Sequence, residues 1–409
     1  LIMLEIVFIC VILFPDIIIR YLPNNGFFNY WDELLFIIIF IVLIIRLTNS
    51  RIKKDALIFF LTLISIIIVG LMGNIIFGYQ LSANAIIRDI VGFLKFPLTL
   101  FALCEFNLTR KLASVFYRII PFLKLIIAII FIFGIISMFF NIGLSQLEYR
   151  HGIHPYMFLF SHPTYLTTFA MMILLALNAA KDCTLIDEIM LLGTLVLGMR
   201  TRGFIFVAIY VFVKYGRSWW FKRLKVLYWY IIFCLIMAVS YNKLMLYASY
   251  STSPRETLYM GGLKLMNICM PIGSGFGTFA SHLSAKMISG VYSVVHISGF
   301  YNDNGTVSAA IGDAGYPYYM AQFGIIGLGL IIILLLFLIG LTKEGINNEN
   351  TFSLNMMWLM IGISLITETI LVNDGVEIAV LMAIICKLSL MTQQEQYNHR
   401  RVKIKYRIR

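Results

Sequence analysis

Arginine side chains are the residues of this sequence with the clearest capacity for chemistry. Arg200 and Arg202 stand between two apolar runs, and Arg255 lies early in the longest polar stretch, residues 247–318. A guanidinium group keeps its charge at any relevant pH and donates two parallel hydrogen bonds to phosphate oxygens. We therefore predict that these arginines bind an anionic ligand such as a diphosphate. Anchoring to lipid headgroups is the competing interpretation for each of them, and it is favoured for Arg150.

Charged residues also occur inside apolar segments. Arg88 and Asp89 lie near one end of such a segment, and Glu368 lies near the end of another. An ionisable group at membrane depth is costly and usually faces a partner or a cavity. Two interpretations stay open: Arg88 and Glu368 bind substrate, or Arg88 forms an ion pair with Glu368 or Asp89. Lys95 is expected to pair with a carboxylate or to extend toward the interface rather than to bind a ligand.

Histidine, cysteine and glycine spacing does not indicate a metal or a nucleotide. His151, His154 and His162 lack the i, i+4 pair of a helical zinc site, and the six cysteines are scattered without CxxC spacing. Residues 273–277, Gly-Ser-Gly-Phe-Gly, follow no predicted strand and precede no Lys-Ser or Lys-Thr, so we expect a flexible turn that brings the backbone close to a ligand or a helix. We predict no metal and no cofactor. The predicted substrate-binding residues are Arg88, Arg150, His162, Arg200, Glu256 and Glu368.

The composition requires lipid around most of the chain. Hydrophobic residues make up 60% and charged residues 13% of the 409 residues, with a mean hydropathy of +0.90, whereas soluble domains are roughly 45–50% apolar and about 25% charged. The fold class predicted is an all-α integral membrane protein. A bilayer crossing takes about 20 apolar residues, which gives about 12 transmembrane helices, with roughly ten as the lower count. The expected spans are 2–20, 33–47, 56–77, 84–104, 119–141, 163–180, 185–199, 203–215, 225–242, 317–341, 354–373 and 375–392.

The distribution of Lys and Arg predicts the orientation of these spans. Basic residues are concentrated in one alternate set of loops and in the tail 393–409, and positive loops face the cytoplasm. Both termini are therefore predicted to be cytoplasmic, and the loop between spans 9 and 10 is predicted to be extracytoplasmic. The net charge of +12 is then explained by membrane topology and by contact with anionic lipid headgroups, and it does not indicate nucleic-acid binding.

Four regions follow from this topology. Residues 1–242 hold helices 1 to 9, and the first segment is expected to be a retained span, because it lacks a basic n-region and carries acidic residues. Residues 243–316 form the long extracytoplasmic loop, which includes an interfacial helix over 258–270. Residues 317–392 hold helices 10 to 12. Residues 393–409 form the basic cytoplasmic tail.

The order of these features resembles the family of Wzy-type O-antigen or capsule polymerases and the related WaaL-type O-antigen ligases. The resemblance covers roughly residues 161–330. It consists of Ser161-His162-Pro163 and Thr201-Arg202-Gly203, each opening a span, Arg255 in the large loop, Pro-Ile-Gly-Ser-Gly-Phe-Gly at 271–277, and the stretch 321–328. In the ligases the corresponding closing stretch begins with a histidine eleven residues before its glycine. Counting back from Gly324 gives Asp313, so the resemblance favours a polymerase.

This resemblance implies glycosyl transfer on the outer face of the cytoplasmic membrane of a bacterium. A sugar hydroxyl of one undecaprenyl-diphosphate-linked repeat unit attacks the anomeric carbon of another, and the lipid diphosphate leaves. Arg202 and Arg255 are the implied catalytic cations at the diphosphate. Asp313 is the implied base or acceptor-orienting residue, with Glu256 as a weaker alternative. The implied partners are the lipid-linked oligosaccharide, membrane lipids, a chain-length regulator and a flippase.

Two other functions stay open at this point. One is a ligase-type transferase of the same superfamily. The other is a flippase or transporter, which also has about twelve helices and intramembrane charges. Two-half transporters usually divide after span six, yet the connection 180–185 is minimal and no repeat relates the halves. The long loop between spans 9 and 10 therefore favours the polymerase.

Overall fold

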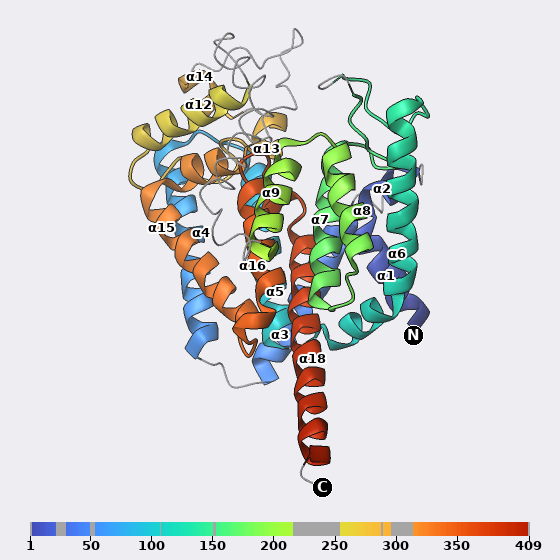
Figure 1. The fold of residues 1–409 in the computed structure, drawn as a ribbon. Helices are drawn as coiled ribbons and strands as arrows, with labels where there is room; N and C mark the ends of the chain where they lie inside the picture. The colour runs from blue at the N-terminus through green and yellow to red at the C-terminus, as the bar shows by residue number, and fades with distance from the viewer. Residues whose placement is uncertain are drawn as a thin grey trace, which may run out of the picture.

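The protein is a bundle of helices (Figure 1). A computed structural model describes residues 2–21, 30–49, 54–106, 108–149, 153–215, 254–287, 289–295 and 314–407, and no strand occurs among them. The helices are α1 (Ile2–Leu13), α2 (Pro15–Tyr21), α3 (Trp31–Asn49), α4 (Lys54–Phe77), α5 (Ala83–Glu105), α6 (Arg110–Phe139), α7 (Pro163–Ala179), α8 (Leu185–Leu197), α9 (Thr201–Tyr215), α12 (Pro254–Ile268), α13 (His282–Lys286), α14 (Val291–Val294), α15 (Gly315–Lys343), α16 (Phe352–Ser364), α17 (Ile370–Asn373) and α18 (Gly375–Arg407).

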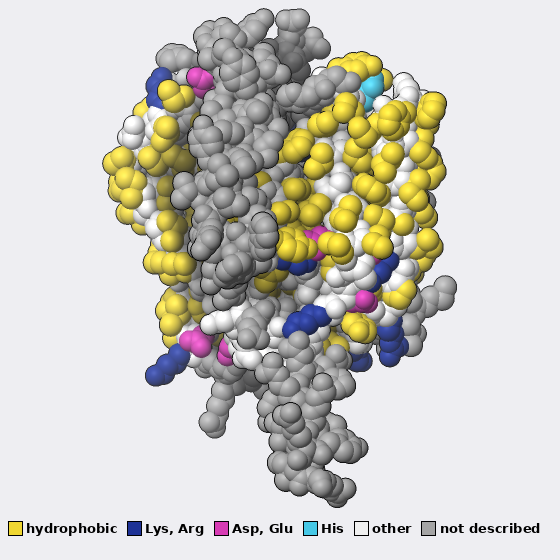
Figure 2. Space-filling view, in the orientation of Figure 1, with side chains coloured by type: hydrophobic (Ala, Val, Ile, Leu, Met, Phe, Trp, Pro, Cys, Tyr) yellow, Lys and Arg dark blue, Asp and Glu magenta, His cyan; other side chains and the backbone are white. Residues whose placement is uncertain are grey.

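The long apolar helices make this a helical membrane protein. Within the described residues, the helices long and apolar enough to cross a bilayer are α4, α6, α15 and the first part of α18, Gly375–Gln394. Helices α7 and α16 are shorter and apolar. Large hydrophobic side chains on α4, α6 and α15 are exposed, and Figure 2 shows a broad hydrophobic surface on the visible face. Such a surface is stable in contact with lipid tails and not with water. The count of twelve spans stays a prediction.

Helices α1 to α9 and α15 to α18 overlap the predicted spans, although α6 begins earlier, at Arg110, and α18 continues to Arg407. Helices α12 to α14 lie in the predicted loop, and two of the predicted spans are broken. The first range contains α1 and α2, which meet at Phe14 just before Pro15, because proline cannot donate the next helical hydrogen bond. The eleventh contains α16 and α17, which are separated by 365–369. The predicted span 225–242 lies outside the described residues.

Helices α5 and α18 form the centre of the bundle. Helix α18 packs against α5, α6 and α7, and α5 also contacts α3 and α17. Ala379 and Ala383 on α18 are fully buried, and such small side chains allow helices in lipid to approach closely. The last turns of α18 protrude from the bundle (Figure 1), so the predicted tail is helical as far as Arg407. We call this the tail end, and the opposite end, which carries α12 to α14, the loop end.

The glycine-rich segment 273–280 is buried inside the bundle rather than extended into solvent. The Asn74 side chain of α4 donates to the Phe276 carbonyl at 2.9 Å and accepts from its N–H at 2.8 Å. Gly275 N–H donates to the Gln322 carbonyl of α15 at 2.9 Å, beside Gly324, whose φ of 57° interrupts the helix. The backbone of this segment therefore lies close to two helices, α4 and α15, as the glycine spacing predicts.

Asp89 fixes the same segment to α5. The carboxylate is fully buried and accepts hydrogen bonds from Gly277 N–H at 2.8 Å and from the Tyr318 hydroxyl at 3.1 Å. A buried carboxylate needs such donors to offset its lost hydration. The alternative of an ion pair between Arg88 and Asp89 is wrong, because Arg88 lies exposed on the other side of α5.

Replacing Gly73 of α4 by alanine is expected to destabilise this packing. A Cβ atom there would lie 2.6 Å from the Gly273 carbonyl oxygen and 2.7 Å from Gly275 N, and backbone atoms of a buried segment cannot move away easily. Overpacking of this kind costs roughly 1–3 kcal/mol. Thermal unfolding of the purified protein in detergent should show a lower midpoint. Gly340→Ala on α15, where nothing lies within 4 Å of the new methyl group, is the matched control, and equal midpoints for the two variants would contradict the expectation.

Candidate functional site

Arg202 is the centre of a buried polar cluster at the loop end. It lies in the first turn of α9, and its side chain is 3% exposed. The guanidinium donates to Glu368, in the connection between α16 and α17, and to the Thr164 carbonyl and the Thr168 hydroxyl of α7, both at 2.5 Å. These bonds hold α7, α9 and the α16–α17 connection together. They also place a permanent positive charge in a region of low dielectric.

Arg200 and His162 form a second pair beside this cluster. Arg200 donates to His162 Nε2 and to the Gln146 side-chain oxygen, both at 2.8 Å. A guanidinium only donates, so His162 Nε2 is the acceptor of this hydrogen bond. His162 is also the residue that precedes the first turn of α7. Two cations, Arg200 and Arg202, therefore converge on the start of α7.

A cavity of about 210 Å³ adjoins Arg202. Thr168 both lines this cavity and accepts a hydrogen bond from Arg202. The walls come from α1 to α3, from α7 and from the junction of α17 with α18. They consist of aromatic, aliphatic and acidic side chains, among them Trp31, Phe160, Tyr165, Phe169, Asp16, Asp32, Asp374 and Glu377. We call it the acidic cavity.

Two of these carboxylates have partners within the bundle. Asp16 accepts hydrogen bonds from the N–H and the hydroxyl of Ser161, both at 2.6 Å. Asp32 is paired at 2.5 Å with Lys95 of α5, which also contacts Glu33 at 2.8 Å. Lys95 thus pairs with carboxylates, as expected.

Asp374 and Glu377 lack such compensation. In the described part of the chain no basic side chain lies within ion-pair distance of either. One oxygen of Glu377, Oε2, is buried without a hydrogen-bond partner. The acidic cavity therefore holds two acidic side chains that no described basic residue pairs with.

No protein-family model, curated protein or solved structure matches this chain. The geometry of the described residues is therefore what defines the site.

Of the predicted site residues, the structure brings four together: His162, Arg200, Arg202 and Glu368. Glu368 contacts Arg202, so the alternative in which Glu368 pairs with Arg88 is wrong. Arg88 is exposed on α5 and no described contact joins it to the cluster. Its exposure follows from its position on the helix face turned away from the neighbours of α5.

The other predicted residues do not join this cluster. Arg255 and Glu256 lie in the first turn of α12, which packs against α15 and lies apart from α9 in Figure 1. Arg150 and Asp313 fall outside the described residues, so the roles predicted for them stay predictions. The helix predicted over 258–270 corresponds to α12, in which Leu258 and Leu265 are buried and Met260 is exposed. Its position at a membrane interface stays a prediction.

The cavity carboxylates Asp16, Asp32, Asp374 and Glu377 were not among the predicted site residues. A signal was present, since each stands inside or at the edge of an apolar run, where an acidic residue is costly. What the sequence could not show is that the first three helices meet the last one. Only that packing gathers these four side chains around one space.

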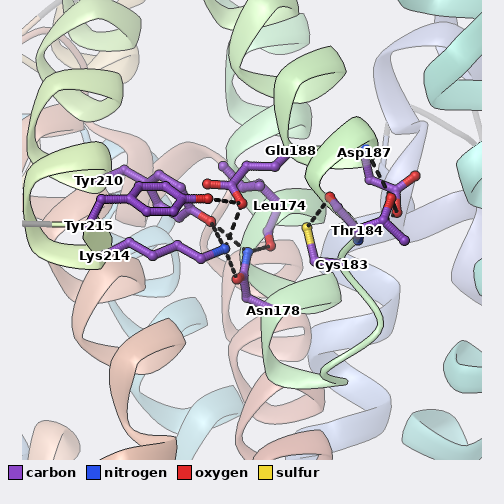
Figure 3. Close-up of polar contacts among 9 residues, drawn as sticks. All are labelled: Leu174, Asn178, Cys183, Thr184, Asp187, Glu188, Tyr210, Lys214 and Tyr215. Carbon is purple, nitrogen blue, oxygen red and sulfur yellow. Dashed lines mark hydrogen bonds and ion pairs between the residues drawn. The ribbon is translucent and has the colours of Figure 1, made fainter. Parts of the chain in front are cut away.

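A second polar cluster lies where α7 and α9 end and α8 begins (Figure 3). Lys214 donates to Glu188 at 2.7 Å, to the Asn178 oxygen at 2.9 Å and to the Tyr210 hydroxyl at 3.0 Å, and the Tyr215 hydroxyl also donates to Glu188, at 2.8 Å. All three donors of the ammonium group are used, which indicates a structural role in joining three helices.

Cys183 lies beside this second cluster (Figure 3), in the turn between α7 and α8. Burial raises the pKa of Cys183 to about 11, so its thiol stays protonated at neutral pH. A protonated thiol is a poor nucleophile. The tail end therefore offers no reactive thiol at this position.

Proposed function

We propose that this protein polymerises undecaprenyl-diphosphate-linked oligosaccharide repeat units by glycosyl transfer on the outer face of the bacterial cytoplasmic membrane. The observation that carries the proposal is the buried Arg202, set beside Arg200 and against a cavity with aromatic and carboxylate walls. Arginine suits a diphosphate, and aromatic rings with hydrogen-bonding carboxylates suit a sugar. The tripeptides that carry the resemblance to Wzy-type polymerases, at 161–163 and 201–203, supply residues of this same cluster.

In the proposed reaction the acceptor hydroxyl loses its proton to a carboxylate, and its oxygen bonds to the anomeric carbon of the donor sugar. The bond from that carbon to the diphosphate oxygen breaks, and the electron pair leaves with the lipid diphosphate. Arg202 stabilises the charge that develops on the leaving group. Because Glu368 holds Arg202 before substrate binds, a diphosphate that takes over the guanidinium frees the Glu368 carboxylate beside the reacting sugar. Asp313 keeps the role that the resemblance implies, whereas the structure supports only Arg202 at the diphosphate, because Arg255 lies apart from it on α12.

Reconstitution tests this proposal directly. Purified protein in liposomes is supplied with a lipid-linked oligosaccharide, and products are separated by length. We expect a ladder of lipid-linked products in which each step adds one repeat unit. Cells without the protein should accumulate single lipid-linked units on the outer face. Products that contain only one unit transferred to a different lipid acceptor would indicate a ligase, and loss of the first unit would contradict polymerisation.

A transporter is the second candidate, and one observation favours it. Asp374 lies in a short break between α17 and α18 and lines the cavity together with Glu377. Carboxylates at broken helices are typical of ion-coupled carriers. The same liposomes separate the candidates: a transporter moves labelled lipid-linked oligosaccharide between leaflets without lengthening it, whereas a polymerase lengthens it when all substrate is already in the accessible leaflet.

A further inference from the structure

The acidic cavity has more carboxylates than cations to balance them. Arg202 pairs with Glu368, and Lys95 pairs with Asp32 and Glu33. Asp374 and Glu377 remain without an ion-pair partner among the described residues, and Glu377 Oε2 is buried without a hydrogen bond. Leaving a buried carboxylate oxygen unpaired is costly. The arrangement calls for a donor that comes from a ligand.

Aromatic rings make up much of the remaining wall. Trp31 and Phe160 are buried and line the cavity together with Tyr165 and Phe169. The face of an aromatic ring attracts a cation, most strongly for tryptophan, and rings around a space recognise ammonium groups. Carboxylates and aromatic faces together therefore favour one kind of ligand, an organic cation with an apolar body.

The spacing of the carboxylates argues against a bare metal ion. Across the residues that the structure describes, no group of three or more His, Cys, Asp or Glu side chains is close enough to hold one. The acids thus surround a space rather than converge on a point. Drug-sized ligands occupy pockets of about 300–1,000 Å³, so a cavity of about 210 Å³ fits a smaller group, such as one sugar ring.

We propose that the acidic cavity binds a sugar residue that carries a protonated amine, with the ammonium group between Asp374, Glu377 and the Trp31 ring. Taking the ammonium group to be part of the glycan substrate rests on the function proposed above, because Thr168 connects the cavity to the arginine assigned to the diphosphate. The same chemistry could come from the ethanolamine headgroup of a lipid. The repeat units of this protein therefore contain an amino sugar whose amine is not acetylated.

Binding of free sugars to the purified full-length protein tests this inference without any need for catalysis. The protein is placed in nanodiscs of phosphatidylglycerol, and glucosamine, N-acetylglucosamine and glucose are titrated at a pH at which the amine is protonated. Glucose is close to glucosamine in size and lacks the amine. We expect glucosamine to bind about tenfold or more tightly than either neutral sugar, as a cation–π contact and a charged hydrogen bond together provide.

Variants locate the site. Asp374→Asn and Glu377→Gln should each remove the preference for glucosamine, while Asp55→Asn, which changes an exposed acid on α4, should keep it. Equal binding of the three sugars by the unmodified protein, no binding, or a preference that survives both cavity variants would overturn the inference. Because the unmodified protein is itself compared across sugars, the result does not depend on the variants folding.

Two further experiments are needed. One distinguishes a glycan ligand from a lipid headgroup or an inorganic ion, and the other distinguishes failure of this inference from failure of the polymerase proposal. If nanodiscs of phosphatidylethanolamine abolish glucosamine binding, or if sodium ions displace it in proportion to their concentration, the ligand is a lipid headgroup or an inorganic ion and the assignment to the glycan is wrong. If glucosamine binds selectively but no product ladder forms, the polymerase proposal fails alone. If acetylated and free-amine repeat units polymerise equally, the present inference fails and the polymerase stands.

Discussion

Arg202→Met is expected to abolish chain growth and also to lower the stability of the folded protein. The substitution removes a buried cation from Glu368 and leaves that carboxylate without its partner. Breaking a buried ion pair by removing one member costs roughly 3–5 kcal/mol. The double variant Arg202→Met/Glu368→Gln should recover much of that stability, because no unpaired charge then remains. It should not recover activity. Thermal unfolding in detergent and the product ladder measure the two effects separately.

Arg118→Met is the matched control, since Arg118 is an exposed arginine of α6. It should leave both the unfolding midpoint and the ladder unchanged. Arg202→Lys keeps a charge but loses the fork of donors that reaches Glu368, Thr164 and Thr168 together, so we expect a weak ladder. Normal polymer from Arg202→Met would remove this residue from the mechanism. A double variant as unstable as the single one would show that the ion pair is not what the single variant loses.

Lys95→Met is expected to be nearly as damaging to the fold. The ammonium group is buried and lies between Asp32 and Glu33 of α3, so its removal leaves two carboxylates without a cation at the edge of the acidic cavity. We expect a loss of roughly 3–5 kcal/mol, seen as a lower unfolding midpoint. The triple variant Lys95→Met/Asp32→Asn/Glu33→Gln should restore most of it.

Lys54 is exposed at the start of α4, so Lys54→Met is the control for these two variants. It should not change the midpoint of thermal unfolding. If Lys95→Met is as stable as the unmodified protein, the contacts between α3 and α5 do not depend on this charge. Partial loss of glucosamine binding in the triple variant is also expected, because Asp32 lines the cavity.

The sequence predicts the helices well and their partners poorly. Apolar runs locate α4, α5 and α15 within a few residues, since any segment that crosses lipid must be helical and apolar. The depth of a residue in the membrane also follows from its position along a span, and the sequence predicts similar depths for Arg88 and Glu368. The direction in which a side chain faces around the helix axis does not follow from the sequence. Arg88 faces outward and Arg202, 166 residues away from Glu368, provides the cation instead.

The glycine-rich segment shows a second limit. Residues 273–277 have the composition of a surface turn, and polar content favoured a place outside the membrane. Their burial depends on Gly73 and Asn74 of α4 and on the helix break at Gly324, all far away in sequence. The alternating glycines of this segment do indicate its burial, because a backbone that packs directly against another backbone leaves no room for side chains.

The walls of the acidic cavity come from both ends of the chain, with Asp16, Trp31 and Asp32 from its beginning and Asp374 and Glu377 from its last helix. During synthesis the early helices enter the membrane long before α18 has been translated. Lys95 can neutralise Asp32 at an early stage, but Arg202 has to wait for Glu368. A nascent chain stopped before the connection between α16 and α17 therefore lacks Glu368, and its Arg202 has no ion-pair partner until that connection is made.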